Sequence, residues 1–404
     1  MSDIYPFRAL HPRPEFVEDV ACPPYDVIST SEARSLAAAN PKSFVRVVRP
    51  EAELPPDLDP HSEHVYSKGA DNLKAHATSD MFSRDTSANV YVYRTIRKGK
   101  TQTGVFACVS TDDYKNSRIL KHEQTRPVKE EDRTRHILAQ QAHAEPVMLT
   151  YRDNATIDEL VVTVQERTPL FDIITPAGNR HTIWRETSPR AIVDAFGEVG
   201  MLYVADGHHR CAAATNAADR IRAGGAAPGS SEFARFPAVL IPMSQMLILA
   251  YNRVVFRLPM TTDAFLEMLK NRSTISKTDK TSPDRPGNVC LYLDGNWYEA
   301  ILPETSSDNL ADTLDVARLS EHLLDPILGI SDVTTDANIE FAGGARGYEF
   351  LEEVVDSGQA ELAISMYPTQ IEDLVAISDA GLLMPPKSTW FEPKLISGLL
   401  IHEF

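Results

Sequence analysis

The spacing of hydrophobic and polar positions predicts a mixture of hairpins and helices along this chain. Strand-like runs on either side of short glycine turns predict three hairpins, at residues 90–109, 171–184 and 289–302. Helical spacing and capping signals predict helices at residues 64–78, 130–144, 316–324, 348–355 and 371–380. Because strands and helices do not alternate regularly, the pattern favours an α+β fold with mixed sheets over a doubly wound sheet.

Capping residues mark two of the expected helices more sharply. Ser29 and Glu32 have the spacing of a capping box, and Asn40 followed by a proline would end that helix. Thr369 and Glu372 have the same spacing ahead of residues 371–380. Residues 223–231 are rich in glycine, alanine and serine, and we expect them to form a flexible surface loop.

The strand-to-helix junction around Gly207 is the most informative stretch of the sequence. A short apolar strand ends at Asp206, and His208, His209 and Arg210 then open an alanine-rich segment of high helix propensity. Unpaired N–H groups and the positive end of the helix dipole meet at such a junction, which therefore predicts an anion site. The alternative is a plain Asp cap with solvent-facing histidines. Adjacent histidines cannot easily chelate one metal as an i, i+4 pair does, which argues against zinc.

Composition narrows the class of protein and of ligand. With 404 residues, the chain is long enough for two or three subdomains, and we expect boundaries that give regions 1–60, 61–235 and 236–404. The formal charge of −17 argues against a nucleic-acid partner but not against small anions. No apolar run is long enough to span a bilayer and no signal segment opens the sequence, so we expect a cytoplasmic protein with no membrane partner.

A second cluster of charges lies between Lys121 and His136. Lys129 and Arg133 are like charges four residues apart, a repulsive spacing that a bound phosphate would relieve. A solvated helix face, with neighbouring glutamates compensating the charge, is the alternative. Glu123 precedes a turn marked by a proline, a position from which a carboxylate can enter a cleft.

Two later segments resemble ligand sites more weakly. Residues 341–347 place Gly343, Gly344 and Arg346 at the start of an expected helix, although a simple tight turn explains the glycines equally well. Residues 384–394 combine prolines, Trp390 and two lysines near the C-terminus. That segment either folds back onto a site or docks through its aromatic side chains.

Almost the whole chain resembles a widespread prokaryotic family that has been labelled only as a domain of unknown function. The matching segments, in chain order, are Pro6-Phe7-Arg8-Ala9-Leu10, Pro23-Pro24-Tyr25-Asp26-Val27, Lys121-His122-Glu123 with Thr125-Arg126-Pro127, Asp206-Gly207-His208-His209-Arg210, Tyr251-Asn252-Arg253, residues 341–347 and residues 384–394. The junction is also similar to the core of the ParB/sulfiredoxin superfamily, over residues 120–218. That superfamily includes kinases that phosphorylate free L-serine.

The second resemblance implies a nucleotide-dependent kinase that acts on free L-serine or a related hydroxyl amino acid, with ATP or ADP and Mg²⁺ as cofactors. The implied partners are a nucleotide and a small amino acid, and a homodimer is also considered. By this resemblance Glu123 is the base that activates the substrate hydroxyl, Asp206 and His209 join it in catalysis, and Asp206 holds Mg²⁺. The expected phosphate-binding residues are Gly207, His208, His209, Arg210, Arg126, Lys129 and Arg133.

Two other functions remain open from the sequence. The ParB branch suggests a regulator or sensor that binds a nucleotide without phosphotransfer. The sulfiredoxin branch suggests a redox enzyme, for which Cys211 is the candidate, since a helix N-terminus would lower the pKa of its thiol. Sulfiredoxin-like sites place the cysteine where this chain has His208 or His209, which makes the redox function the weakest of the three.

Overall fold

The computed structural model describes residues 3–225 and 231–404, and the chain divides into two compact units. The first unit comprises Met1–Lys121, Thr125–Met246 and Pro393–Phe404, and the second comprises His122–Gln124 and Leu247–Glu392. The expected boundaries at residues 60 and 235 differ from this division, because the chain leaves the first unit only after Met246. Most of the expected loop at 223–231 falls on residues 226–230, which lie outside the described residues.

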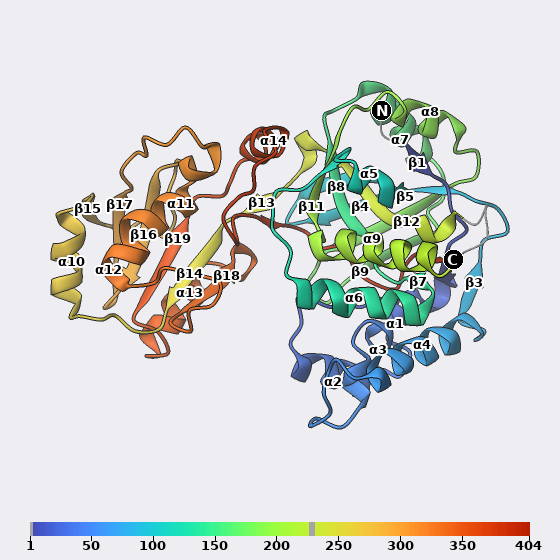
Figure 1. Cartoon of the computed structure of the whole chain (residues 1–404), viewed down its shortest axis with the longest axis horizontal. Helices are drawn as coiled ribbons and strands as arrows, with labels where there is room; N and C mark the ends of the chain where they lie inside the picture. Colours follow the sequence, from blue (N-terminus) through green and yellow to red (C-terminus); the bar gives the residue numbers. More distant parts are fainter. Residues whose placement is uncertain (1–2, 226–230) are drawn as a thin grey trace. The chain divides into compact units, whose positions relative to one another are not determined.

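Within the described residues, the first unit is built on a mixed sheet of nine strands (Figure 1). Its order is β6-β11-β8-β12-β5-β4-β10-β9, with β1 paired to β5. The strands are β1 (Ile4–Tyr5), β4 (Val90–Arg97), β5 (Lys100–Ser110), β6 (Ile119–Leu120), β8 (Val147–Tyr151), β9 (Phe171–Ile174), β10 (Arg180–Glu186), β11 (Leu202–Asp206) and β12 (Arg235–Pro242). Strand β8 pairs with β12 in parallel and with β11 in antiparallel orientation. The α+β expectation and the first two hairpins are therefore confirmed.

Helices and short helical turns pack around this sheet. They are α1 (Val17–Val20), α2 (Thr30–Ala39), α3 (Val45–Val48), α4 (Glu63–Ala77), α5 (Thr111–Lys115), α6 (Pro127–Gln140), α7 (Ala155–Gln165), α8 (Arg190–Phe196) and α9 (His208–Ala223), with short turns η1 (Pro14–Phe16), η2 (Pro50–Glu53), η3 (Glu232–Ala234) and η4 (Met243–Gln245). The capping box of Ser29 and Glu32 is confirmed at the start of α2. Helices α6 and α9 lie side by side (Figure 1).

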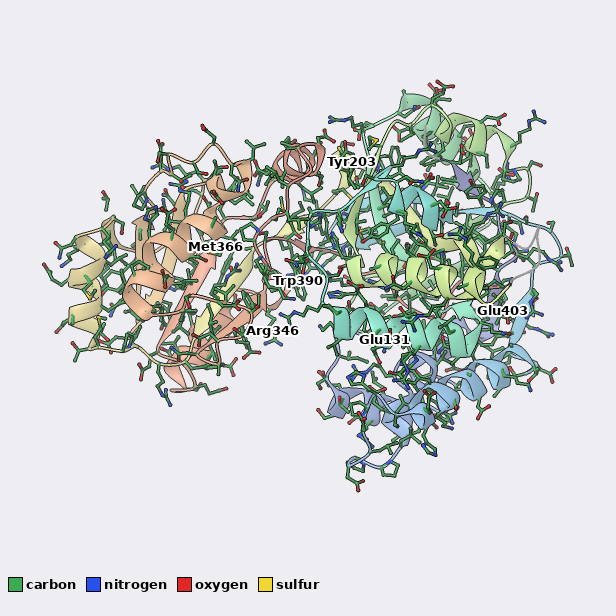
Figure 2. The ribbon with its side chains drawn as sticks, viewed as in Figure 1. Glu131, Tyr203, Arg346, Met366, Trp390 and Glu403 are labelled. Atoms are coloured by element: carbon green, nitrogen blue, oxygen red, sulfur yellow. The ribbon has the colours of Figure 1, made fainter. Side chains whose placement is uncertain are left out.

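Helix α6 begins three residues earlier than the sequence pattern predicted and ends four residues earlier. Pro127 occupies its first turn, where the fixed φ of proline suits a helix and its missing N–H costs nothing. The helix ends where Gln141 adopts a left-handed conformation with a φ of 50°. Glu131, labelled in Figure 2, extends from α6 and forms an ion pair with Arg220 of α9 at 2.5 Å.

The second unit is built on an antiparallel sheet of six strands in the order β15-β17-β16-β19-β14-β18, counted over its described residues. These strands are β14 (Tyr251–Val255), β15 (Thr274–Thr278), β16 (Asn288–Leu293), β17 (Asn296–Ile301), β18 (Ile339–Gly343) and β19 (Leu362–Met366). The helices are α10 (Thr262–Lys270), α11 (Asp315–Leu319), α12 (Asp325–Leu328), α13 (Glu349–Asp356) and α14 (Ile371–Asp379), with turns η5 (Leu310–Thr313), η6 (Ser320–Leu324) and η7 (Gly344–Arg346). The third expected hairpin, β16–β17, is confirmed.

Three boundaries of the second unit were predicted wrongly. The apolar run at residues 246–251 predicts a single strand, but the structure has two elements there, β13 (Ile248–Leu249) and β14. The expected helix at 316–324 changes from α-helix to a π-helical turn at Ser320. The capping box of α14 uses Gln370 and Asp373, one residue later than predicted, because the Thr369 hydroxyl instead donates to the carbonyl of Ser388 at 2.7 Å.

The last residues of the chain return to the first unit. Strand β21 (His402–Glu403) pairs with β7 (Ala142–His143). Strand β2 (Leu10–Pro12) pairs with β3 (Phe82–Arg84), and its first residue, Leu10, also forms a β-bridge with Ile401. A second bridge joins Cys22 and Ser397. These pairings hold residues 393–404 against the N-terminal segment and fix the position of Lys394.

Candidate anion-binding site

The junction between β11 and α9 has the backbone conformation that the sequence predicted. Asp206 ends β11, and Gly207 occupies the N-cap position of α9 with a left-handed φ of 100°. A Cβ atom at Gly207 would lie 3.0 Å from Cγ1 of Val147 and 3.1 Å from Nε of Arg210. Only glycine meets both demands without strain, so the junction requires Gly207 for its conformation and for the close packing around it.

Two cations hold the carboxylate of Asp206. Nζ of Lys394 lies 2.7 Å from one carboxylate oxygen, and Nη2 of Arg210 lies 2.7 Å from the other. Burial alone would raise the pKa of Asp206, but the charges of Lys394 and Arg210 outweigh it and hold the pKa well below its usual range. Arg210 also donates to the carbonyl of Pro146 and is itself buried. The Arg210 guanidinium, which was predicted to bind phosphate, therefore forms hydrogen bonds within the protein that stabilise the junction.

The start of α6 lies directly beside the start of α9. The backbone N–H of Arg126, the N-cap residue of α6, donates to Nε2 of His209 at 3.1 Å. His209 is in the first turn of α9, so the N-termini of two helices are adjacent and their dipoles add positive potential at the same place. Arg126 and Lys129 are both exposed here. The structure thus brings together Gly207, His209 and Arg126. Next to them lie Asp206 and the two cations that pair with its carboxylate, Lys394 and Arg210, which are called the cation pair on Asp206 below.

Arg133 lies deeper than predicted and already has a partner. Its Nη2 is 2.6 Å from the carboxylate of Asp132, and its guanidinium lies 4.2 Å from the centroid of the Tyr25 ring. Asp132 therefore compensates the charge that the sequence assigned to nearby glutamates. Glu131 instead pairs with Arg220, while the Glu130 carboxylate accepts from the hydroxyl of Thr125.

Sequence reasoning missed a half-buried carboxylate near the junction. Oε1 of Glu145 accepts a hydrogen bond from the hydroxyl of Ser397 at 2.6 Å and another from the backbone N–H of Tyr25 at 3.1 Å. Burial raises the pKa of Glu145, although Arg210 and Ser397 act against that shift. Its signal in the sequence was weak, because a single glutamate after an expected helix looks like an ordinary surface residue. The contribution of Lys394 agrees with the fold-back alternative for residues 384–394.

Glu123 belongs to the second unit, whereas the junction belongs to the first. Its neighbour His122 is buried. The backbone carbonyl of His122 accepts from the N–H of Met384 at 2.8 Å, and its ring Nε2 lies 3.2 Å from the Thr389 hydroxyl. The role of Glu123 as a base stays a prediction.

Residues 341–347 also lie in the second unit, where a Cβ on Gly343 would collide with the Trp390 ring.

The donors around Asp206 do not form a coordination set for Mg²⁺. Both carboxylate oxygens already contact cations, and over residues 3–225 and 231–404 no group of three or more His, Cys, Asp or Glu side chains gathers as a metal cluster. Mg²⁺ often reaches proteins through one or two carboxylates and the phosphates of its substrate. The role of Asp206 as a Mg²⁺ ligand therefore stays a prediction.

The structure corrects the expectation for Cys211. The sequence placed its thiol at a helix N-terminus, where a lowered pKa would make it reactive. Instead its side chain is fully buried, and burial raises the pKa of the thiol to about 12. A thiol in this environment is protonated at neutral pH and shielded from solvent.

The fold and the junction define an α+β protein whose most distinctive polar cluster lies at a strand–glycine–helix turn. More narrowly, the chain belongs to the family described as "Protein of unknown function (DUF1015)", which it matches over residues 4–317. No curated protein matches it in sequence. Within the described residues, no helix combines the length and the apolar character needed to cross a membrane.

Solved structures of other proteins are similar to the chain at low identity. A free serine kinase in complex with AMP is 12% identical, with 73% of this chain and 91% of that chain covered and a TM-score of 0.39. SbnI with a C-terminal truncation, from Staphylococcus aureus, is 15% identical over 74% and 85% of the two chains, with a TM-score of 0.37. A conserved hypothetical protein from Pyrococcus furiosus is 13% identical over 72% and 93%, with a TM-score of 0.36.

Proposed function

We propose that this protein is a nucleotide-dependent phosphotransferase that phosphorylates a small hydroxyl amino acid, with free L-serine as the first candidate. The observation that carries the proposal is the left-handed Gly207 between β11 and α9, beside the cation pair on Asp206. A glycine at this position lets a phosphate approach the backbone N–H groups of the first helical turn. The adjacent N-terminus of α6 adds to the potential that attracts it.

Phosphoryl transfer depends mainly on positioning and on neutralising negative charge, which this cluster suits. The oxygen of the serine hydroxyl would form a bond to the terminal phosphorus of ATP or ADP. The bond between that phosphorus and the bridging oxygen breaks, and its electron pair stays on the departing nucleotide. The hydroxyl proton would pass to a carboxylate base, for which Glu123 is the candidate. Gly207, His208 and His209 would contact the phosphates, with Arg126 and Lys129 at the exposed rim.

The test is formation of O-phosphoserine by the purified full-length protein with L-serine, ATP or ADP, and Mg²⁺, followed by mass spectrometry. We expect Glu123→Ala to abolish the product while nucleotide binding, measured as a thermal shift, survives. Glu166→Ala changes an exposed glutamate at the end of α7 and is the matched control. Unchanged product formation by Glu123→Ala would remove Glu123 from its role.

A second candidate is a sensor that binds the nucleotide without transferring phosphate. It is favoured by the engagement of Asp206 with Lys394 and Arg210, which leaves the carboxylate little freedom to act in chemistry. A thermal shift with ATP, ADP or CTP, combined with no turnover of serine or of other hydroxyl amino acids, would select the sensor over the kinase.

A further inference from the structure

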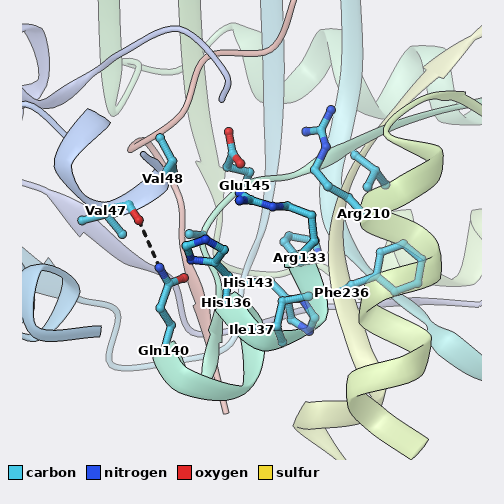
Figure 3. Close-up of a pocket in the computed structure, with 13 residues that line it drawn as sticks. Val47, Val48, Arg133, His136, Ile137, Gln140, His143, Glu145, Arg210 and Phe236 are labelled. Atoms are coloured by element: carbon cyan, nitrogen blue, oxygen red, sulfur yellow. Dashed lines mark hydrogen bonds between the residues drawn. The ribbon is translucent and has the colours of Figure 1, made fainter. Parts of the chain in front are cut away.

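A small, partly open cavity lies inside the first unit, next to the junction. It offers about 40 Å³ to the centres of water molecules. Its polar lining comes from α6, from β7 and the segment that follows it, and from α9: Arg133, His136, Gln140, His143, Glu145 and Arg210. Apolar side chains of α3 and β12 complete the wall. Figure 3 shows Arg133 extending toward Glu145 among these residues.

Three polar atoms of this lining have no hydrogen-bond partner among the described residues. Nδ1 of His136, Nε2 of His143 and Nε of Arg210 are buried and make no hydrogen bond to any described part of the protein. The three residues are only 5%, 4% and 9% exposed. A buried polar atom without a partner destabilises the protein, so a molecule that forms hydrogen bonds with several of these atoms binds more favourably than one that does not. The cavity is therefore suited to a polar occupant.

The size of the cavity limits what that occupant can be. A water molecule needs about 10–15 Å³ of such space, so the cavity accommodates about three or four waters. At about 30 Å³ of liquid volume per water, these would occupy about 90–120 Å³. A small α-amino acid displaces a similar volume, whereas a nucleoside or a long side chain does not fit.

The charges of the lining suit a zwitterion. The two bonds to Glu145 from Ser397 and Tyr25 both fall on Oε1, so an ammonium group would meet Oε2. Arg133 uses Nε and Nη2 for Asp132, and Arg210 uses Nη1 and Nη2 for Pro146 and Asp206. Nη1 of Arg133 and Nε of Arg210 are the guanidinium atoms that a carboxylate would meet. Burial lowers the pKa of both histidines well below its usual range, so their neutral rings can bond a hydroxyl group.

We propose that this cavity is the acceptor site and that it binds a small zwitterionic α-amino acid, with the ammonium group on Glu145 and the carboxylate on Arg133 and Arg210. That this amino acid accepts a phosphate rests on the proposed function. Arg210 connects the two places, because its side chain lines the cavity while its backbone is in the first turn of α9. The acceptor therefore binds next to the nucleotide phosphates.

The experiment is isothermal titration of the full-length protein with L-serine, with and without a non-hydrolysable ATP analogue. On the wild-type protein, N-acetyl-L-serine lacks the ammonium charge and L-serine methyl ester lacks the carboxylate. We expect each to bind at least about 10-fold more weakly than L-serine, as is usual when a charge-assisted hydrogen bond is lost. These comparisons need no substitution in the protein, so they do not depend on the folding of any variant.

Glu145→Gln keeps an oxygen that can accept from Ser397 and Tyr25 but removes the charge. We expect it to weaken L-serine binding at least about 10-fold and to leave the weak binding of N-acetyl-L-serine unchanged. Glu166→Gln, the control, should bind L-serine as the wild type does. If the cavity instead holds an inorganic anion, phosphate will bind in place of L-serine, and Glu145→Gln will bind phosphate more tightly.

The outcomes separate this inference from the proposed function. Binding of L-serine that needs Glu145, without any formation of phosphoserine, would reject the kinase and keep the cavity site. Formation of phosphoserine with an unchanged KM for serine in Glu145→Gln would overturn the cavity site and keep the kinase. The cavity site would also be overturned if L-serine bound neither in the presence nor in the absence of the nucleotide analogue.

Discussion

Lys394 and Asp206 form an ion pair at 2.7 Å although 188 positions separate them in the sequence. Both side chains are mostly buried, with 18% and 23% of their surface exposed. The pair connects the returning C-terminal segment to the strand that leads into Gly207. The carboxylate at the centre of the candidate site is therefore positioned by its close neighbour Arg210 and by a residue from the C-terminal end of the sequence.

This pair should contribute measurably to stability. In a double-mutant cycle of Asp206→Asn and Lys394→Met, followed by urea unfolding, we expect a coupling energy of about 1–3 kcal/mol, since breaking one side leaves a mostly buried charge behind. The ion pair of Lys115 and Asp219, which is close to half exposed on both sides, is the control and should give about 0–1 kcal/mol. Equal coupling energies for the two pairs would show that burial of Asp206 adds nothing.

Gly207 should be far less tolerant of substitution than another glycine with positive φ. Gly207→Ala places a Cβ against Val147 and Arg210 at a φ of 100°, and we expect a loss of about 1–3 kcal/mol from backbone strain and crowding. Gly178 has a φ of 78° with open space around its Cβ position, so Gly178→Ala isolates the backbone effect. Differential scanning calorimetry of both variants gives the comparison, and similar melting temperatures would contradict the crowding argument.

The junction itself was predictable because its signals are local. A glycine after an apolar strand, followed by a segment of high helix propensity, determines the turn and the helix within a few residues. The hairpins of β4–β5 and β16–β17 were predictable for the same reason, since each turns on adjacent residues. Such features need no knowledge of distant contacts.

The partners of the junction could not be predicted, because they come from distant parts of the sequence. Lys394 reaches Asp206 only because residues 393–404 return to the first unit. The half-buried carboxylate of Glu145 is fixed in place only because Ser397 and the backbone of Tyr25 donate hydrogen bonds to it. The inward turn of Arg210 depends on the carbonyl of Pro146. The sequence identifies these residues as polar, but their burial and pairing depend on the tertiary fold.

Acid should destabilise the first unit in part through His181. This side chain is 1% exposed, its Nδ1 lies 2.7 Å from the Tyr93 hydroxyl, and burial lowers its pKa to about 4. In the unfolded chain the histidine pKa is about 6.5, so the unfolded state binds this proton more readily than the folded state. The free energy of unfolding is therefore unaffected by this group above pH 6.5 and decreases as the pH falls toward 4. The loss from this one group is about 3 kcal/mol.

His181→Asn removes the titration while keeping a polar group near the position of Nδ1. Urea unfolding between pH 7.5 and 4.5 should show that wild type and variant converge on acidification, because only the wild type has this histidine to protonate. His64→Asn, at an exposed position of α4, should run parallel to the wild type. A constant gap between wild type and His181→Asn would assign the acid sensitivity to other groups.

Cys211 should behave as a packing residue. Its thiol is fully buried with a pKa of about 12, so the fraction of nucleophilic thiolate at pH 8 is negligible. We expect iodoacetamide to leave the Cys211 peptide unmodified in the native protein over the time in which free cysteine is fully alkylated, and to modify it in urea. Mass spectrometry of the digested protein provides the measurement. Cys211→Ala should bind nucleotide as the wild type does. Rapid modification of native Cys211 would instead restore the redox hypothesis, because it would require an accessible thiol with a lowered pKa beside the anion site.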